Sequence, residues 1–246
     1  MKQIPSKESQ REYYNERWSK AVSRPINQLE LKRLISILQM IDRLPLKIKD
    51  EMKILDLGCG SGWLSSILSH VGTATGIELS SEAVFAARKR YSFVDFRDGD
   101  LFEVLTEKDT YDIVVSQEVI EHVEDQPAFI NLVANSLKLG GHFIFTTPNA
   151  WTQAHRTQEE HKKWGLQPIE NWIDRKQIKQ LLMPRFDAIE IRSIIDGFGT
   201  TGIFRVVNSF KLRQLLNSIG LSHLYSDLML KLDFGLHLVA KARRKI

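Results

Sequence analysis

Short apolar runs alternate with amphipathic stretches from residue 53 to about residue 147, and this alternation restricts the fold more than any other feature. The runs KILDL, TATGIEL, FVDFRDGDL, YDIVVSQ and HFIFTTPN contain segments typical of strands, and the stretches between them have helical spacing. Strands that alternate with helices form a parallel sheet covered by helices on both faces. Such sheets bind their ligands beyond the carboxyl ends of the strands, near the point where the strand order reverses.

The flanking segments are predicted from the same periodicities. Residues 8–20 and 26–43 have helical spacing, and the second helix ends before Pro45. A helix is also predicted over PAFINLVANSLKLGG, ending at its glycines. Beyond Pro148 we expect helices in DRKQIKQLL and NSFKLRQLLNSIG and strands in FDAIEIRSI and FGLHLVAKARR. The predicted organisation is one domain over 1–246. Within it we expect an N-terminal helical cap over 1–45, a ligand-binding core over 50–150, and two insertions over 148–172 and 197–230.

Composition bears mainly on the cellular compartment. The 246 residues are 43% hydrophobic and 26% charged, as in ordinary globular domains, and no apolar run approaches the roughly 20 residues that span a membrane. The first residues lack the apolar core of a secretory signal, and a single cysteine, Cys59, excludes an internal disulfide framework. We therefore expect a cytoplasmic protein without a transmembrane segment.

The net charge of +4 is partly due to the tail KARRKI at residues 241–246. Such a tail binds an anionic membrane surface or nucleic acid in some proteins and is a solvated chain end in others. This run is too short for a polybasic tract or a two-signal membrane anchor. The sequence therefore favours a solvated end, and nucleic acid is not the expected partner.

The loop after the first predicted strand, DLGCGSG, places Gly58, Gly60 and Gly62 at alternate positions. Glycine tolerates positive φ and lets a ligand approach the backbone, and the helix that follows directs its free N–H groups at that ligand. A dinucleotide site has the pattern Gly-x-Gly-x-x-Gly, whereas here the third glycine comes one residue early. Asp56 at the strand end would also repel a pyrophosphate. The loop is therefore either a tight turn or, as we favour, a site for a ligand with a positive centre.

Acidic residues also follow the next two strands. Glu78 comes 20 residues after Gly58, a position from which a carboxylate accepts hydrogen bonds from both ribose hydroxyls. Asp100 follows the third strand, where it can accept from an adenine amino group while the N–H of Leu101 donates to a ring nitrogen. Asp98 competes for this role, and we favour Asp100. The three strand ends together indicate a nucleoside ligand.

The motifs ILDLGCGSGWLS, GIELS, RDGDL, YDIVVSQEVIEHV and LKLGGHFIFTTPN, in this order, resemble those of class I S-adenosylmethionine-dependent methyltransferases over about residues 50–150. The ending GLHLVAKARR is similar to the last strand of that family. The resemblance implies a doubly wound, Rossmann-like fold with a seven-stranded, mostly parallel sheet whose last strand is antiparallel. It also implies that S-adenosylmethionine lies across the strand ends and leaves as S-adenosylhomocysteine.

The resemblance implies a role for each residue of the cofactor site. Those that would contact the methionine portion of the cofactor are Asp56, Gly58, Gly60 and Gln117. Glu78 would bind the ribose, and Asp100 and Leu101 would bind the adenine. Three neighbours in the same loops complete the predicted cofactor site, namely Cys59, Gly62 and Leu79. The positive sulfonium and ammonium groups of this ligand also account for the acid at position 56.

Within the family, EVIEHVED and TTPN most resemble the branch that contains the ubiquinone-biosynthesis O-methyltransferases and methyltransferases of polysaccharide pathways. Glu118, Glu121 and His122 are the predicted catalytic residues, and in a helix they would share one face beside the sulfonium. The three side chains would bind a divalent cation that lowers the pKa of a substrate hydroxyl. Alternatively, His122 alone would act as general base, or the segment is only a solvated helix start. Other histidines lack metal-ligand spacing, so a metal is possible but not favoured.

We therefore predict an enzyme that methylates an oxygen of a small-molecule or glycan acceptor, bound by the N-terminal cap and the two insertions. Tyr13, Tyr14 and Trp18 would form either an aromatic lid over the cofactor or ordinary helix core. The alternatives to this function are a catalytically inactive, nucleoside-binding partner protein and an RNA 2′-O-methyltransferase.

A further hypothesis concerns the second insertion, residues 197–230. Its phenylalanines, together with the leucines of 212–221, could form an apolar wall for a lipid-linked acceptor. These phenylalanines are Phe198, Phe204 and Phe210.

Overall fold

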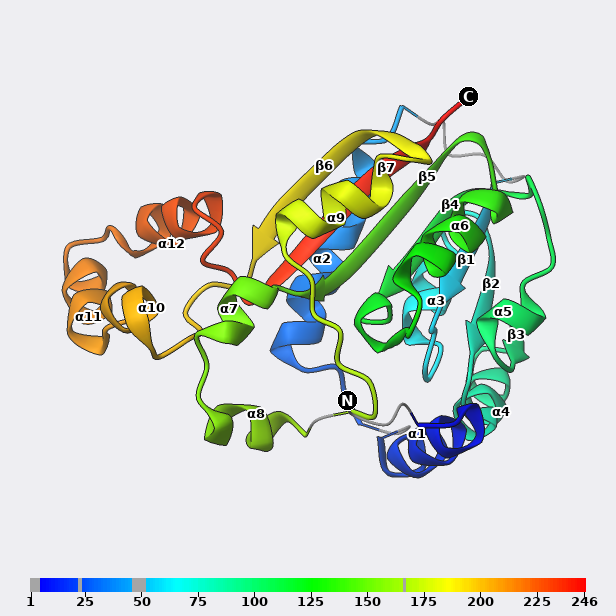
Figure 1. Cartoon of the computed structure of the whole chain (residues 1–246), viewed down its shortest axis with the longest axis horizontal. Coiled ribbons are helices and arrows are strands. Elements are labelled where there is room, and N and C mark those ends of the chain that lie inside the picture. Colours follow the sequence, from blue (N-terminus) through cyan, green and yellow to red (C-terminus); the bar gives the residue numbers. More distant parts are fainter. Residues whose placement is uncertain (1–4, 22–23, 46–51, 166) are drawn as a thin grey trace.

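The computed structural model describes residues 5–21, 24–45, 52–165 and 167–246, so parts of the predicted segments 1–45, 50–150 and 148–172 lie outside the described residues. These residues contain a seven-stranded sheet in the order β3-β2-β1-β4-β5-β7-β6 (Figure 1). The strands are β1 Lys53–Leu57, β2 Thr73–Glu78, β3 Asp95–Asp98, β4 Tyr111–Gln117, β5 Leu137–Pro148, β6 Phe186–Ile194 and β7 His237–Arg244.

The strands from β3 to β5 pair in parallel, and β7 pairs antiparallel with both β5 and β6. The first strand, β1, lies near the middle of the sheet. The next two strands extend the sheet outward to β3, and β4 then pairs with the other side of β1. The switch in strand order therefore lies between β1 and β4. The predicted fold, a doubly wound and mostly parallel α/β sheet with an antiparallel last strand, is confirmed.

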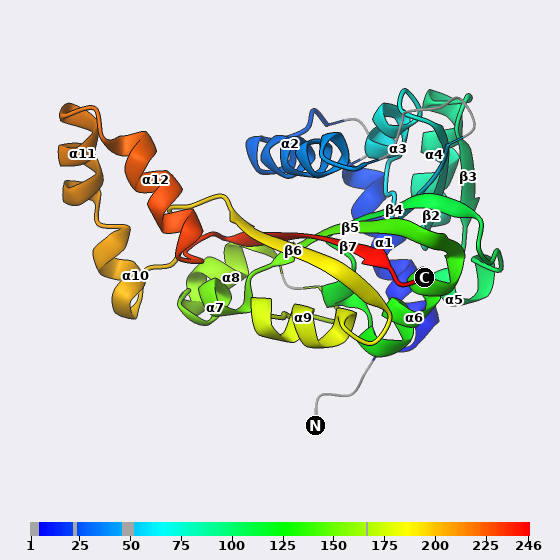
Figure 2. The ribbon, with the colours of Figure 1, turned by 90° about the horizontal axis from the view of Figure 1, so that it is seen from above.

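Helices cover both faces of the sheet (Figure 2). On one face lie α2 (Gln28–Asp42), α3 (Trp63–Leu68) and α4 (Ser81–Arg90), whose apolar side chains pack with those of β1 and β4. On the other face lie α5 (Leu101–Val104), α6 (Gln126–Ser136) and α9 (Arg175–Leu182), packed around Phe129, Phe143 and Phe186. Burial on both faces explains why the central strands are continuous apolar runs in the sequence.

The first helix, α1 (Lys7–Ala21), lies beside α4 at the end of the sheet where the carboxyl ends of β1 and β2 meet (Figure 1). None of its described side chains is buried. Asn15 accepts a hydrogen bond from the hydroxyl of Ser80, the N-cap of α4, over 2.7 Å. The interpretation of Tyr13, Tyr14 and Trp18 as ordinary helix core is therefore wrong, because this helix covers a polar edge rather than the core.

One predicted helix end is also wrong. The helix over PAFINLVANSLKLGG ends at Ser136, and Leu137–Gly141 belongs to β5. Tyr111 pairs with Leu137 while Ile113 pairs with His142, so the extra residues of β5 form a bulge opposite β4. A Cβ at Gly141 would lie about 3 Å from three backbone oxygens, and this close approach requires glycine there.

Both predicted insertions are largely helical. The first insertion forms α7 (Ala150–Ala154) and α8 (Gln158–Trp164), which begin at the N-caps Asn149 and Thr157. The second forms α10 (Gly202–Val207), the predicted α11 (Phe210–Ser218) and α12 (Ser222–Lys231). Because α7, α8 and α10 are only one or two turns long, they are too short for an apolar stripe to reveal them in the sequence.

The basic tail is not a solvated chain end, since Lys241–Arg244 belong to β7. Lys241 forms an ion pair with Glu190 over 3.0 Å, Arg243 pairs with Asp187 over 2.8 Å, and Arg244 pairs with an aspartate before β4. These charges bind neighbouring acids and are not a free basic tract. In the part of the chain that the structure describes, no helix combines the length and apolar character needed to cross a membrane.

Candidate functional site

A cavity of about 810 Å³ lies at the carboxyl ends of β1, β2 and β4, beside α1. Most of the predicted site residues line this cavity, although they come from separate parts of the sequence. These residues are Asp56, Gly58, Cys59, Gly60, Glu78, Leu79, Asp100, Leu101, Gln117, Glu118 and His122. The predicted residues Gly62 and Glu121 do not line it. The strand ends thus form one wall of one cavity, as the parallel topology requires.

The glycine loop is shaped for a close approach of a ligand to its backbone. Gly60 has a φ of +52°, and its N–H donates to the Glu78 carboxylate over 3.0 Å, which joins the loop to the end of β2. A Cβ at Gly60 would lie 2.4 Å from the ring of Trp18, so the ring rests directly on the loop. Gly62, with a φ of +78°, instead packs against Phe96 and Ala87 and so lies outside the cavity.

Asp56 is a buried carboxylate with one free oxygen. Its Oδ2 accepts a hydrogen bond from the Ser65 hydroxyl over 2.6 Å, and its Oδ1 has no hydrogen-bond partner within the described residues. Burial raises the pKa of Asp56 to about 7. The Oε1 of Gln117 also lacks a partner among those residues. Two unpaired buried acceptors facing one cavity fit a ligand that carries an ammonium group.

Glu78 is held in place by the backbone on both sides. Its two oxygens accept hydrogen bonds from the N–H groups of Gly60 and Ser80, each over 3.0 Å. Burial raises the pKa of Glu78, whereas these hydrogen bonds lower it, and the effect of burial is the larger. A carboxylate oxygen can accept more than one hydrogen bond, so this fixed side chain keeps capacity for a pair of hydroxyls.

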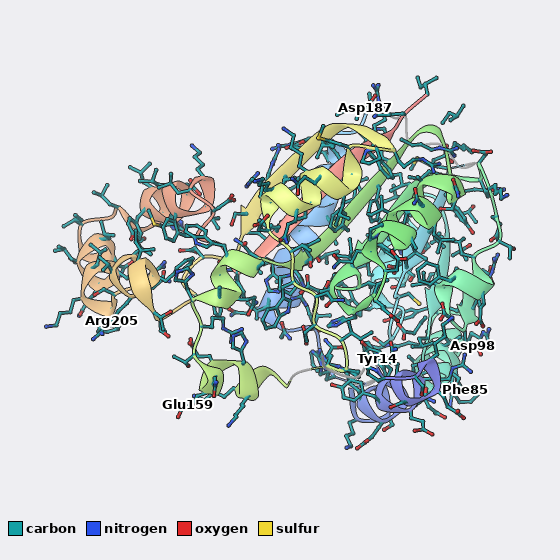
Figure 3. All side chains as sticks on the ribbon, in the orientation of Figure 1. Tyr14, Phe85, Asp98, Glu159, Asp187 and Arg205 are labelled. Atoms are coloured by element: carbon teal, nitrogen blue, oxygen red, sulfur yellow. The ribbon has the colours of Figure 1, made fainter. Side chains whose placement is uncertain are left out.

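Asp100 faces the cavity, whereas Asp98 is turned outward. Asp100 caps α5 by accepting from the N–H of Phe102 over 2.8 Å, and its other oxygen forms an ion pair with Lys7 of α1 over 2.7 Å. Asp98 pairs with Arg88 over 3.2 Å and lies at the outer edge of the molecule (Figure 3). The geometry thus agrees with the preference for Asp100.

The prediction that Glu118, Glu121 and His122 share one helical face is wrong. Glu118 has a φ of +58° and precedes a short 3₁₀ helix, η1 (Ile120–His122), so it is not part of a helix. The Glu121 carboxylate accepts from Thr147 over 3.1 Å, away from the cavity. Within the described residues no group of three or more acidic, histidine or cysteine side chains is arranged to hold a metal ion.

Glu118 belongs to a buried charge cluster instead. Its Oε2 lies 2.8 Å from Nε2 of His237 in β7 and 3.6 Å from Arg33 in α2. Burial by itself would raise the pKa of Glu118, but its interactions with His237 and Arg33 lower it to about 2. Burial, and then the Glu118 charge, raises the pKa of Glu121. The pKa values of these neighbouring carboxyls are therefore shifted in opposite directions, that of Glu118 downward and that of Glu121 upward.

His122 lines the cavity with both ring nitrogens hydrogen-bonded. Its Nδ1 lies 2.7 Å from the carbonyl of Ile169, and its Nε2 lies 2.7 Å from the side-chain nitrogen of Gln167. A carbonyl only accepts, so Nδ1 carries the proton and Nε2 accepts from the amide. Burial lowers the pKa of His122, and the imidazole is therefore neutral near pH 7.

Several residues of the cavity could not be found from the sequence. They are Lys7, Arg33, Gln167 and Ile169. His237 does not line the cavity, but it contacts Glu118, which does. None belongs to a motif, and each reaches the site through the packing of an element remote in the chain. The first insertion contributes Gln167 and Ile169, whereas no residue of 197–230 lines the cavity. Phe204 instead packs with Met229 and Phe234, which does not support the predicted apolar wall.

The comparisons with known proteins agree with this geometry. Residues 29–222 match the methyltransferase-domain family. The chain is 30% identical over 202 residues to the ubiquinone biosynthesis O-methyltransferase of Bartonella tribocorum, covering 72% of this chain and 77% of that protein.

Two solved structures have the same fold. One is the geranyl diphosphate C-methyltransferase of Streptomyces coelicolor, with a TM-score of 0.62, 15% identity and 98% of both chains covered. The other is phosphoethanolamine N-methyltransferase 2 of Haemonchus contortus bound to S-adenosyl-L-methionine, with a TM-score of 0.60 and 19% identity, covering 86% of this chain and about half, 52%, of that one. The sequence match, the strand order and the acidic strand-end cavity lead to one conclusion: this chain belongs to the methyltransferase-domain family and is a class I S-adenosylmethionine-dependent methyltransferase.

Proposed function

We propose that the cavity binds S-adenosylmethionine with its methionine end at β1 and its adenine at α5. Asp56 and Gln117, whose free oxygens face the cavity, would accept from the ammonium group. Glu78 would accept from the ribose hydroxyls, and Asp100 with Leu101 would contact the adenine. Gly58, Cys59, Gly60 and Leu79 would supply the backbone of the same wall, and Gly62 would act only by fixing the turn.

We further propose that the reaction is O-methylation of a small-molecule or glycan acceptor, with His122 as general base. The observation that carries this is an imidazole at the cavity whose Nδ1 is held by the Ile169 carbonyl, so that Nε2 is the acceptor and its hydrogen-bond partner is Gln167, another residue of the cavity. A hydroxyl that replaced the Gln167 amide would lie within reach of Nε2. The O-methyltransferase name of the Bartonella tribocorum relative supports oxygen as the methylated atom.

The chemical step is an in-line displacement. A lone pair of the acceptor oxygen attacks the methyl carbon, the carbon–sulfur bond breaks, and its electron pair stays on sulfur to give S-adenosylhomocysteine. The hydroxyl proton passes to Nε2 of His122. Alignment of the two reactants in one cavity supplies much of the rate enhancement. Glu118, Glu121, Arg33 and His237 fix the polar floor of the site without taking the proton.

The predicted organisation also stays a proposal. The cap 1–45 and the core 50–150 would bind the cofactor, and 148–172 would contribute to the acceptor side through Gln167 and Ile169. We propose a cytoplasmic location on the sequence features given above.

An activity screen tests the proposed function. Release of S-adenosylhomocysteine would be followed over quinol, sugar-nucleotide, glycan and RNA pools, with and without magnesium, for the wild type and for His122→Gln. The matched control is His155→Gln, because Nδ1 of His155 also bonds to a carbonyl but the residue lies outside the cavity. We expect turnover with one of the first three pools, lost only in His122→Gln. Turnover of RNA alone, or equal turnover by both variants, would contradict the proposal.

A further inference from the structure

The helices α10, α11 and α12 form an arm, residues 202–232, that extends away from the sheet in both views (Figures 1 and 2). A small apolar cluster of Phe204, Met229 and Phe234, together with Trp151 and Tyr225, holds the base of the arm to the body. Two hydrogen bonds also join the arm to the segment that precedes it. Asn208 donates to the carbonyl of Phe198, and Arg213 donates to the carboxylate of Asp196. The arm is thus a built element with a fixed base.

The rest of the arm exposes an unusual amount of apolar surface. Nine of the eighteen exposed large hydrophobic side chains in the described part of the chain lie in it. They are Ile203, Val206, Phe210, Leu215, Ile219, Leu221, Leu224, Leu228 and Leu232. Monomeric soluble proteins rarely expose apolar side chains in such concentration, and exposed apolar patches commonly mark interaction sites.

The exposed leucines of α12 follow helical spacing. Leu221, Leu224, Leu228 and Leu232 are three, four and four residues apart, so they form one stripe along the helix. Met229 and Tyr225, which pack on the base of the arm, lie on a neighbouring stripe. The helix therefore has one apolar stripe that the body uses and a second that it leaves exposed.

The charges of the arm are almost all positive. It carries Arg205, Lys211, Arg213 and Lys231 against a single acid, Asp227. Arg213 is paired with Asp196 at the base, whereas Arg205, Lys211 and Lys231 are exposed. Figure 3 shows Arg205 on the part of the arm turned away from the sheet. The outer surface thus combines leucine, isoleucine and phenylalanine side chains with basic ones.

We propose that the arm binds the surface of an anionic lipid bilayer. Helices with an exposed apolar stripe and basic residues lie in the plane of a membrane interface, where apolar burial and attraction to anionic headgroups act together. A symmetric dimer through the arm would place the same basic residues of two copies against each other, which disfavours a second copy as the occupant. Because the arm stands clear of the body, a flat surface can reach it without meeting the sheet.

The position of the arm relates it to the cavity. The chain enters the arm after β6 and returns into β7, where Ile194 pairs with His237. His237 contacts Glu118, which lines the cavity. A bilayer bound by the arm would therefore lie near the catalytic edge of the sheet. This inference rests on the arm alone and not on the proposed acceptor.

Vesicle co-sedimentation tests the proposal. The full chain would be mixed with vesicles of phosphatidylcholine alone or of phosphatidylcholine with phosphatidylglycerol, at low and high salt. We expect binding to the anionic vesicles, weakened by salt, and a loss of at least about tenfold in the double variant Leu224→Glu with Leu228→Glu, since charged groups replace two inserted leucines. Arg205→Glu with Lys211→Glu should weaken binding to anionic vesicles as well.

The matched control is Leu139→Glu with Met183→Glu, which changes two side chains of similar exposure, 61% and 53%, outside the arm. This variant should bind vesicles like the wild type. If the glutamate variant of α12 does not fold, as judged by its thermal midpoint and S-adenosylhomocysteine binding, Leu228→Gln replaces it.

Three results would overturn the proposal. They are wild-type protein that stays in solution with anionic vesicles, equal losses in the arm and control variants, and a dimer in sedimentation equilibrium that the Leu224→Glu change dissociates. The last would identify the arm as a self-association surface. Since no methyl transfer is measured, failure here leaves the proposed O-methylation unaffected, and failure of the activity screen leaves the arm proposal unaffected.

Discussion

His122 is the residue whose removal should affect chemistry and spare binding. We expect His122→Gln to lower kcat by about 10²- to 10⁴-fold, the usual contribution of a general base, with the affinity for S-adenosylhomocysteine changed less than about threefold. Because its lowered pKa lies below the ordinary 6.5, the wild-type rate should rise through a pH below that value and then stay level. Steady-state kinetics and calorimetry measure both effects. A fall in affinity equal to the fall in kcat would indicate a structural role instead.

Glu78 should act on affinity. Replacing it by alanine removes a charged acceptor for two ribose hydroxyls, and hydrogen bonds to charged groups contribute about 1.5–3 kcal/mol each, so S-adenosylhomocysteine should bind at least about tenfold more weakly. Calorimetry provides the measurement, and Glu82→Ala, an exposed acid at the start of α4, is the control. Unchanged binding in Glu78→Ala would remove this residue from the proposed site.

Asp56 makes the free protein sensitive to pH. Its pKa in the folded state is about 7, above the ordinary 3.8, so the folded protein holds this proton more tightly than the unfolded chain. The resulting stabilisation is complete below about pH 3.8 and is lost as the pH rises to about 7. We expect the free energy of unfolding to fall between pH 5 and pH 8, and Asp56→Asn to reduce that fall.

Denaturant unfolding at several pH values checks this, with Asp98→Asn as the exposed control. Glu78, whose pKa burial also raises, contributes in the same direction, so part of the pH dependence should remain in Asp56→Asn. A variant with the full wild-type pH dependence would show that Asp56 is not the responsible group.

At the scale of an element, we expect α1 to act as a lid over the cavity. Lys7 reaches Asp100, Asn15 reaches Ser80, and Trp18 rests on Gly60, so the helix crosses the cavity wall from α5 to the glycine loop. Tyr14 also lines the cavity, and Figure 3 shows it where α1 meets the body. A polar helix that is not required by the core can move without disrupting it.

Trp18→Ala should open this lid. We expect S-adenosylhomocysteine to bind about tenfold more weakly and to dissociate faster, because an apolar side chain that the ligand would cover is worth roughly 1.5–3 kcal/mol. The change in tryptophan fluorescence on binding should also shrink. Stopped-flow fluorescence measures this, with Trp172→Phe, outside the cavity, as the control. Tighter binding in Trp18→Ala would show that the ring blocks the site rather than covers it.

At the scale of the whole molecule, the cofactor should stabilise the sheet as a unit, because in the proposed site it would contact the ends of β1, β2 and β4 together. A ligand at 100 times its Kd adds about 2.7 kcal/mol, which for a chain of this size raises Tm by roughly 5–10 °C. Calorimetric scans with S-adenosylhomocysteine measure the shift. The arm variants should show the same shift as the wild type, and a smaller one would mean that the arm and the cofactor site are coupled.

The same local patterns that predicted the sheet also predicted many of the residues that line the cavity. Strands, the glycine loop and the strand-end acids depend on a few neighbouring residues, and parallel topology brings every carboxyl end to one edge. Asp56, Glu78 and Asp100 were therefore found before any tertiary contact was known. Prediction failed for helices that are short or whose pattern was not recognised: α5, α7, α8, α10 and α12 were missed, and the bulge in β5 was taken for the end of a helix.

The sequence by itself determined the α/β alternation, the doubly wound sheet and the nucleoside-type cavity, because these depend on periodicity and on backbone freedom at glycine. Tertiary structure alone decided how Glu118, Glu121 and His122 are used. The pKa of Glu118 is low because β7 and α2 bring His237 and Arg33 to it, and that of His122 is low because the ring is buried, while Ile169 and Gln167 fix its tautomer. Such protonation states depend on burial and on partners far away in the chain, and no local spacing records either.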